Sequence, residues 1–111
     1  GEEGRIINLL DWRALRPGPD HLPYSISKSA LAALTHSLAA ALAPQITVNG
    51  LALGAVLPPA DGSPAQNILN KVPSGRWASL EEVNQALIFL LKGPAYITGE
   101  ILYVDGGRHL F

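Results

Sequence analysis

The stretch Y-S-I-S-K-S-A-L-A-A-L-T, Tyr24–Thr35, opens the longest helix that the sequence predicts. A short apolar run, Arg5–Leu10, precedes it, and a second one, Ile46–Leu53, follows it. Neither run alternates cleanly between apolar and polar residues, which is typical of parallel strands covered on both faces. Strand, helix and strand in this order predict an α/β fold with a parallel sheet.

The helix is expected to run from Tyr24 to Leu42 and to end before Pro44. It is rich in alanine, and small residues on several faces would allow close packing on both sides. Its larger apolar side chains recur at helical spacing and form one stripe. The stripe contains Ile26, Ala30, Leu34, Leu38 and Ala41.

The second half of the chain repeats the alternation of helix and strand. Gly54–Gly75 is rich in Pro, Gly and Ser, so we expect an irregular segment that acts as a lid. Ser79–Glu82 has the pattern of a capping box and predicts a helix to about Leu91, with an apolar face. Ile101–Val104 predicts the last strand, and Asp105-Gly106-Gly107 predicts a turn more readily than a phosphate cradle.

Composition excludes several classes of function. The 111 residues suffice for one small domain, and the net charge of −1 without a basic run argues against nucleic acid as a partner. With no cysteine, the chain has no disulfide framework and no thiolate metal site. No apolar run approaches the length of a membrane span, and no signal peptide is evident. We therefore expect a cytoplasmic location.

Tyr24 and Lys28 are candidate catalytic residues because a four-residue step puts them on the same face of the helix. A phenol with a pKa of about 10 must lose roughly 3 units, or about 4 kcal/mol, to donate protons readily near neutral pH. A fixed ammonium in a partly dry cleft is a suitable source of that stabilisation. The alternative is an ordinary helix with a half-buried tyrosine and a solvated lysine.

Asp11 is the third candidate. A carboxylate at the C-terminal end of a parallel strand points into the ligand crevice of such a sheet, where it can pair with a nitrogen-rich ring. The alternative is a strand-end aspartate that caps the following loop.

Trp12 either lines the mouth of the same crevice or packs on the sheet edge. The histidines lack metal-ligand spacing, so surface or loop positions are expected for His21, His36 and His109.

Four stretches together resemble the C-terminal half of a short-chain dehydrogenase/reductase. They are G-R-I-I-N-L-L-D (Gly4–Asp11), Y-S-I-S-K-S-A-L-A-A-L-T (Tyr24–Thr35), L-A-P-Q-I-T-V-N-G-L-A-L-G (Leu42–Gly54) and Y-I-T-G-E-I-L-Y-V-D-G-G (Tyr96–Gly107). They follow in the family's order with near-family spacing. Most of the family has Ser at the position of Asp11, and the aspartate resembles the pteridine reductase branch, including its dihydromonapterin and dihydrofolate reductase-like members.

The resemblance implies the C-terminal half of a Rossmann-like, doubly wound parallel sheet and an NAD(P)H-dependent reduction of a pteridine or a related carbonyl or imine. It implies that Tyr24 donates the proton and that Lys28 binds the nicotinamide ribose, with Tyr24, Lys28, Gly54 and Val56 as cofactor contacts. NADP(H) is expected in preference to NAD(H). The family has Pro before Gly54, where this chain has Leu53.

The glycine-rich turn that receives the cofactor pyrophosphate in such folds has no counterpart in the sequence. We therefore expect residues 1–111 to be the C-terminal part of one reductase domain whose cofactor-binding half is absent, and to be inactive alone. A homo-oligomer, a dimer or tetramer, is expected through the helix that starts at Tyr24. No nucleic acid or membrane partner is expected. The alternative is a non-catalytic module for assembly or interaction.

Overall fold

The computed structural model describes residues 4–12, 22–56 and 66–111. Within these ranges it leaves a few side chains undescribed, namely those of Leu22, Tyr24, Ser25, Gln66 and Asn67. The elements follow in the order β1 (Gly4–Asp11), α1 (Leu22–Leu42), β2 (Ile46–Leu53), α2 (Gln66–Leu69), α3 (Leu80–Lys92) and β3 (Ile101–Val104), with a short 3₁₀ turn, Arg108–Leu110, near the C-terminus.

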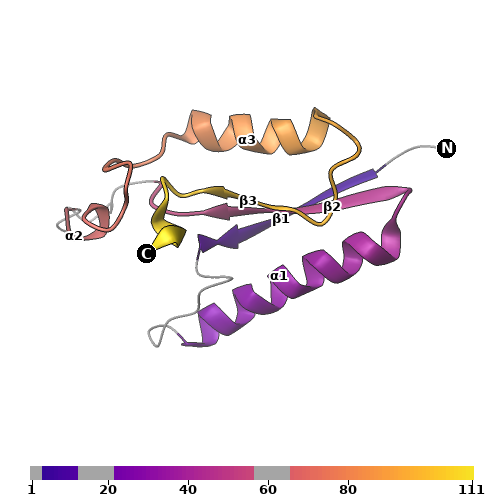
Figure 1. The fold of residues 1–111 in the computed structure, drawn as a ribbon, viewed down its shortest axis with the longest axis horizontal. Helices are drawn as coiled ribbons and strands as arrows, with labels where there is room; N and C mark the ends of the chain where they lie inside the picture. The colour runs from indigo at the N-terminus through magenta and orange to yellow at the C-terminus, as the bar shows by residue number, and fades with distance from the viewer. Residues whose placement is uncertain (1–3, 13–21, 57–65) are drawn as a thin grey trace.

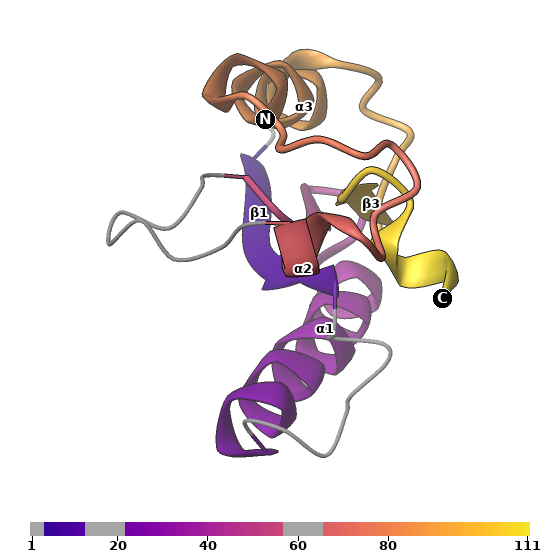
Figure 2. The same cartoon turned by 90° about the vertical axis from the view of Figure 1, so that its left-hand side faces the viewer.

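The strands form a parallel sheet in the order β1-β2-β3. Helix α1 covers one face of this sheet and α3 covers the other (Figure 1). The turned view in Figure 2 shows the same three layers. The fold is therefore α/β and Rossmann-like, as the sequence predicts, and each strand begins and ends within one residue of its predicted bounds.

Strand β2 is the centre of the hydrophobic core. Val48, Leu51 and Ala52 are completely buried because α1 and α3 cover both faces of the strand and its two neighbours pair with both edges. This arrangement explains the continuous apolar character of the strand. On one face, Leu10 and Ala32 join Ala52 in a packed cluster.

Helix α1 turns small side chains toward the sheet. Ala32, Thr35 and Ala39 are buried, and the Thr35 hydroxyl accepts a hydrogen bond from Asn8 of β1 at 2.9 Å and donates one to the Leu31 carbonyl at 2.8 Å. An apolar stripe usually faces the core, but the predicted stripe of α1 lies largely on the opposite face. Its members Ile26, Ala30, Leu34 and Ala41 are exposed, and Leu38 is half-buried.

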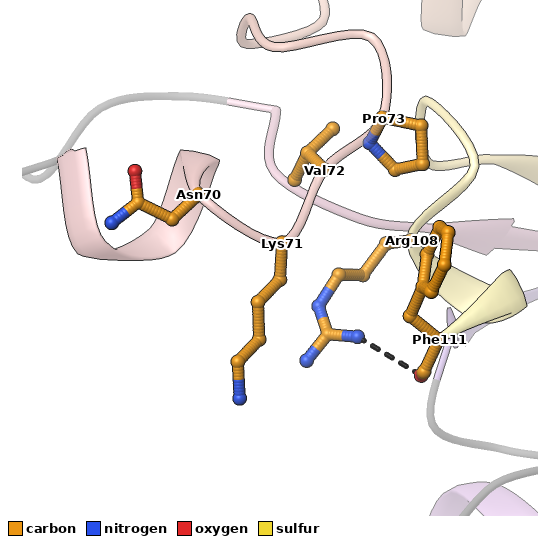
Figure 3. Close-up of a pocket in the computed structure, with 6 residues that line it drawn as sticks. All are labelled: Asn70, Lys71, Val72, Pro73, Arg108 and Phe111. Carbon is orange, nitrogen blue, oxygen red and sulfur yellow. Dashed lines mark hydrogen bonds between the residues drawn. The ribbon is translucent and has the colours of Figure 1, made fainter.

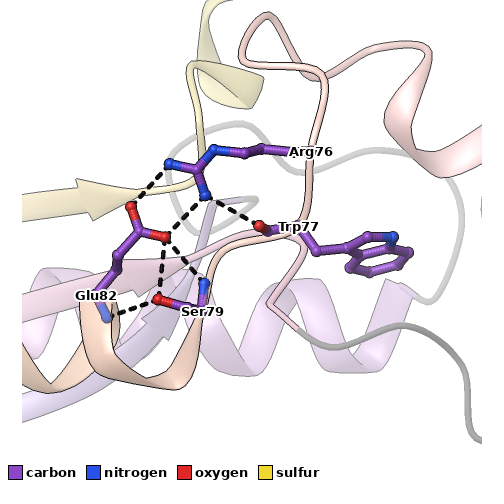
Figure 4. Close-up of polar contacts among 4 residues, drawn as sticks. All are labelled: Arg76, Trp77, Ser79 and Glu82. Atoms are coloured by element: carbon purple, nitrogen blue, oxygen red, sulfur yellow. Dashed lines mark hydrogen bonds and ion pairs between the residues drawn. The ribbon is translucent and has the colours of Figure 1, made fainter.

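Helix α3 begins with the predicted capping box. Ser79 Oγ accepts from the Glu82 main-chain nitrogen at 3.1 Å, and the Glu82 carboxylate accepts from the Ser79 nitrogen at 3.0 Å (Figure 4). Leu90 is the buried residue of the helix, and its carbonyl accepts a hydrogen bond from Arg5 of β1 at 3.1 Å. Leu91, at the predicted end of this helix, is exposed.

Two expectations about the connecting segments need qualification. The segment Gly54–Gly75 is not irregular throughout, because α2 forms one short helix within it. Residues 57–65 of the predicted lid lie outside the described residues. Among the helices of the described ranges, none combines the length and the hydropathy that crossing a bilayer would require.

Candidate functional site

The C-terminal ends of the three strands meet at one edge of the sheet. Asp11, the last residue of β1, lies in register with Leu53 of β2, which in turn pairs with Val104 of β3. Helix α1 starts near this edge and runs back along the sheet, and α2 and the C-terminus lie at the same end of the molecule (Figure 1). This is the edge at which ligands bind in open parallel α/β sheets.

Lys28 reaches this edge from α1. Its Nζ donates a hydrogen bond to the Leu9 carbonyl at 3.3 Å, two residues before Asp11. The lysine therefore lies against the end of β1. Tyr24 belongs to α1 one turn before Lys28. The phenol of Tyr24 lies outside what the structure describes, so its role as proton donor stays a prediction.

Trp12 packs against a residue that the sequence analysis did not single out. The guanidinium carbon of Arg108 lies 4.0 Å from the centre of a Trp12 ring, in a cation–π contact. This contact connects the C-terminal turn to the residue that follows Asp11. No local signal marks Arg108, because its partner lies far away in the sequence.

Gly54 has a structural reason for lacking a side chain. Its main-chain nitrogen donates to the Val104 carbonyl at 3.1 Å, and a Cβ added to it would lie 2.6 Å from the Cβ of Asp105. Packing of β2 against β3 therefore requires glycine whether or not a cofactor binds there. Val56 is part-buried two residues further on. The cofactor contacts expected of Gly54 and Val56 stay predictions.

The buried carboxylate of Asp105 organises the C-terminal turn. It accepts hydrogen bonds from the main-chain nitrogens of Gly107, at 3.0 Å, and His109, at 2.9 Å. It also lies 2.7 Å from Nδ1 of the His109 ring. Gly106 and Gly107 adopt positive φ angles of 62° and 92°, which glycine tolerates without strain. The Asp-Gly-Gly sequence is therefore a strand-terminating turn, as expected.

His109 is not simply a surface residue. Its ring is part-buried and stacks on Tyr103 with 3.9 Å between ring centres. Burial raises the pKa of the Tyr103 phenol, and the negative charge of Asp105 raises this pKa further. His36 is exposed, as expected, and His21 lies outside the described residues. The described part of the chain contains no cluster of His, Asp and Glu suited to a metal ion.

An open cavity of about 780 Å³ lies between the segment after α2 and the C-terminal turn. It is lined by Asn70, Lys71, Val72, Pro73, Arg108 and Phe111 (Figure 3). The sequence analysis missed Lys71 for the same reason as Arg108, since neither belongs to a recognisable motif. Lys71 and Arg108, from two separate segments, thus line one cavity, and Lys28 of α1 contacts the end of β1.

Comparison with known proteins agrees with this geometry. Residues 1–109 match a family model described as enoyl-(acyl carrier protein) reductase. Pteridine reductase 1 of Leishmania tarentolae is 39% identical over 115 residues, which cover 99% of this chain and 40% of that protein. Carbonyl reductase family member 4 of Danio rerio is 38% identical over 109 residues, which cover 96% of this chain and 46% of that protein.

Solved structures give the same result. The structure of FolM alternative dihydrofolate reductase 1 from Brucella canis, complexed with NADP, matches with a TM-score of 0.89 and 34% identity. The match covers 99% of this chain and 44% of that one. The chain therefore spans less than half the length of the relatives that it matches.

Proposed function

Because the chain belongs to the short-chain dehydrogenase/reductase family, we propose that it forms the C-terminal part of an NADP(H)-dependent reductase that acts on a pteridine or a related carbonyl or imine. The family assignment supports an oxidoreductase. The pteridine substrate is the finer part of the proposal. It is supported by the likeness to a pteridine reductase and by Asp11 at the end of β1.

One observation carries the proposal, namely the position of Lys28 beside the strand that ends at Asp11. The hydrogen bond to the Leu9 carbonyl holds the ammonium at the ligand-binding edge of the sheet. Tyr24, one helical turn earlier, belongs to the same end of α1. The ammonium of Lys28, Asp11 at the end of β1 and Tyr24 one helical turn before Lys28 together support reduction of a nitrogen-rich ring.

Lys28 carries N–H donors at the ligand-binding edge of the sheet, and we propose that they would hold the ribose hydroxyls of a nicotinamide cofactor. When bound, the cofactor supplies the hydride. The role proposed for Lys28 is to stabilise the phenolate form of Tyr24, as an ammonium beside a phenol does. Tyr24 donates its proton to the substrate atom that becomes basic, and Asp11 accepts an N–H of the substrate ring and fixes its orientation.

The proposal is tested with the full-length protein that carries this sequence. We expect consumption of NADPH with dihydrobiopterin as substrate, and slower or no consumption with a simple aliphatic ketone. An Asp11→Ser variant is expected to lose pterin reduction and to retain or gain ketone reduction, because serine offers a neutral donor to a carbonyl oxygen. Equal pterin turnover by the Asp11→Ser variant would contradict the role of Asp11 in orienting the ring.

We further propose that the protein assembles as a homo-oligomer through the outer face of α1. Ile26 and Leu34 of this face are 58% and 48% exposed, and the alanines beside them are exposed too. An apolar face of this kind usually marks an interface. A two-fold pairing of α1 helices would cover the face on both copies at once.

A further inference from the structure

A threonine hydroxyl joins the middle of α1 to β1 inside the core. Thr35 is completely buried, and its Oγ accepts a hydrogen bond from Asn8 Nδ2 at 2.9 Å. The same hydroxyl donates to the Leu31 carbonyl, one helical turn earlier, at 2.8 Å. Its donor and an acceptor lone pair are therefore both used, as expected of a buried hydroxyl. A hydroxyl held from two sides has one orientation, so this bond fixes the helix against the strand.

The bond lies close to the contact that Lys28 makes with β1. Asn8 immediately precedes Leu9, whose carbonyl accepts from Lys28 Nζ. Thr35 follows Lys28 by seven residues, which is close to two helical turns, so both side chains lie on the face that α1 turns toward the sheet. Helix and strand are thus joined at two points, roughly 10 Å apart along the helix axis.

The two hydrogen bonds differ in strength. The bond from Lys28 is long, at 3.3 Å, and exposed, so water competes for both of its groups. Between the two points, Leu10 and Ala32 belong to one packed cluster, but apolar contact is non-directional and resists sliding less than a hydrogen bond does. The Asn8–Thr35 bond is therefore the stronger constraint on the register of α1 along β1.

We propose that Asn8 and Thr35 are positioning residues for the reductase reaction. Their hydrogen bond fixes the register of α1 along β1 and thereby holds Lys28, and Tyr24 one turn before it, at the ligand-binding edge of the sheet. This inference rests on the proposed function and deepens it, because it assigns a part in that function to two residues of the helix–strand contact.

The first experiment needs no turnover and follows Lys28 directly. The full-length protein, without cofactor, is treated with a limiting amount of acetic anhydride, and mass spectrometry compares acetylation of Lys28 with that of Lys92 in the last turn of α3. Thr35→Val is nearly isosteric and removes the hydroxyl. It should raise acetylation of Lys28 relative to Lys92 several-fold, because an amine released from the Leu9 carbonyl is more accessible to the reagent. An unchanged ratio would overturn the proposal.

The second experiment measures kcat as a function of pH. In the proposed function, the alkaline limb of this profile reports ionisation of the proton donor Tyr24. Moving an ammonium from about 4 Å to about 6 Å from a phenol, at an effective dielectric constant of about 20, raises the phenol pKa by about 1 unit. Thr35→Val should therefore shift the limb toward higher pH by up to about 1 unit, with little change in KM. Thr35→Ser keeps the hydroxyl and should retain the wild-type limb.

The shift can be assigned to the helix register because the substitutions leave the charges of both elements unchanged. Apart from Tyr24 and Lys28, the ionisable side chains of β1 and α1 are those of Arg5, Asp11 and His36. All of them are present in every variant.

Further variants separate positioning from stability. Thr35→Val leaves the Asn8 amide without this partner and should lower the melting temperature, whereas the double variant Asn8→Leu with Thr35→Val replaces both partners by apolar groups and should recover much of it. The double variant still lacks the directional bond, so its alkaline limb and its acetylation ratio should stay shifted. Thr98→Val is the matched control. Its hydroxyl accepts from the Val48 nitrogen at 3.0 Å, so its loss should lower the melting temperature and leave the limb in place.

The outcomes are distinguishable. If the limb and the acetylation ratio of the double variant recovered with its melting temperature, the Asn8–Thr35 bond would have a stability role only, and the proposal would be wrong. A limb that stays in place in Thr35→Val, or one that shifts equally in Thr98→Val, would also overturn it. If Thr35→Val does not fold, the double variant serves for both measurements. Absence of turnover with every pterin and ketone would count against the proposed function, and the acetylation ratio would still decide whether the bond positions Lys28.

Discussion

The ammonium of Lys28 lies 3.3 Å from the main-chain oxygen of Leu9, so the first half of α1 is joined to the end of β1 by a hydrogen bond. A charge-assisted bond to a carbonyl restrains the lysine more than solvent would. The restraint matters for the proposed role of Lys28, because an ammonium can lower the pKa of a phenol only if it stays near that phenol.

Tyr24→Phe in the full-length protein should lower kcat by about 100- to 10,000-fold, the usual contribution of a positioned proton donor. The ring would be kept and only the hydroxyl lost, so the NADPH dissociation constant should stay nearly the same. Steady-state kinetics and a fluorescence titration with NADPH would measure the two quantities. Unchanged turnover would leave Tyr24 as a packing residue on an ordinary helix.

Glu82→Gln should make stability less dependent on acid pH. The Arg76 guanidinium, through its hydrogen bonds, and then Ser79 hold the pKa of the Glu82 carboxyl at about 2, below its ordinary value of 4.5. A lowered pKa adds stability that is fully present above pH 4.5 and is lost as the pH falls toward 2. The difference in melting temperature between wild type and variant should therefore shrink as the pH is lowered from 4.5 toward 2.

The control for this experiment is Glu81→Gln, a substitution in the same first turn of α3 but outside the capping box. Both glutamates lie near the positive end of the helix dipole, so the control accounts for that general effect. The Arg76–Glu82 pair is exposed, and added salt should reduce its contribution. If the melting temperatures of the Glu82→Gln and Glu81→Gln variants depended equally on pH, this would contradict a specific role for the Arg76–Glu82 pair shown in Figure 4.

Gly54→Ala should destabilise the protein by about 1–3 kcal/mol, as overpacking of a core does. The added methyl group would lie 2.6 Å from the Asp105 Cβ and 2.8 Å from its Cα, and a main-chain atom cannot easily move away. Gly4→Ala is the control, because its methyl group would meet only the Ile46 side chain, at 3.3 Å. Urea unfolding of both variants would measure the effect, and equal stabilities would refute the packing argument.

Leu34→Glu should separate the proposed oligomer, because it places a charge in the exposed apolar face of α1. Light scattering on the full-length protein at micromolar concentration would measure the mass, with Gln45→Glu, an exposed position after the helix, as the control. A monomeric wild-type protein would rule out this assembly. An oligomer that survives Leu34→Glu would place the interface elsewhere.

The sequence predicts the elements of this fold well because their signals are local. The capping box at Ser79 and the Asp-Gly-Gly turn at Asp105 depend on residues within four positions of one another. The apolar run of β2 likewise reflects burial on both faces.

Other features depended on contacts between distant residues. Periodicity identified an apolar stripe on α1, but the sheet selected the smaller residues Ala32, Thr35 and Ala39, because they allow close approach and Thr35 bonds to Asn8. The need for glycine at position 54 arises from Asp105 on the neighbouring strand. The cavity with Lys71 and Arg108 forms only when the segment after α2 meets the C-terminal turn. Local patterns record how each residue relates to its neighbours in the chain, whereas such a site arises from the packing of whole elements.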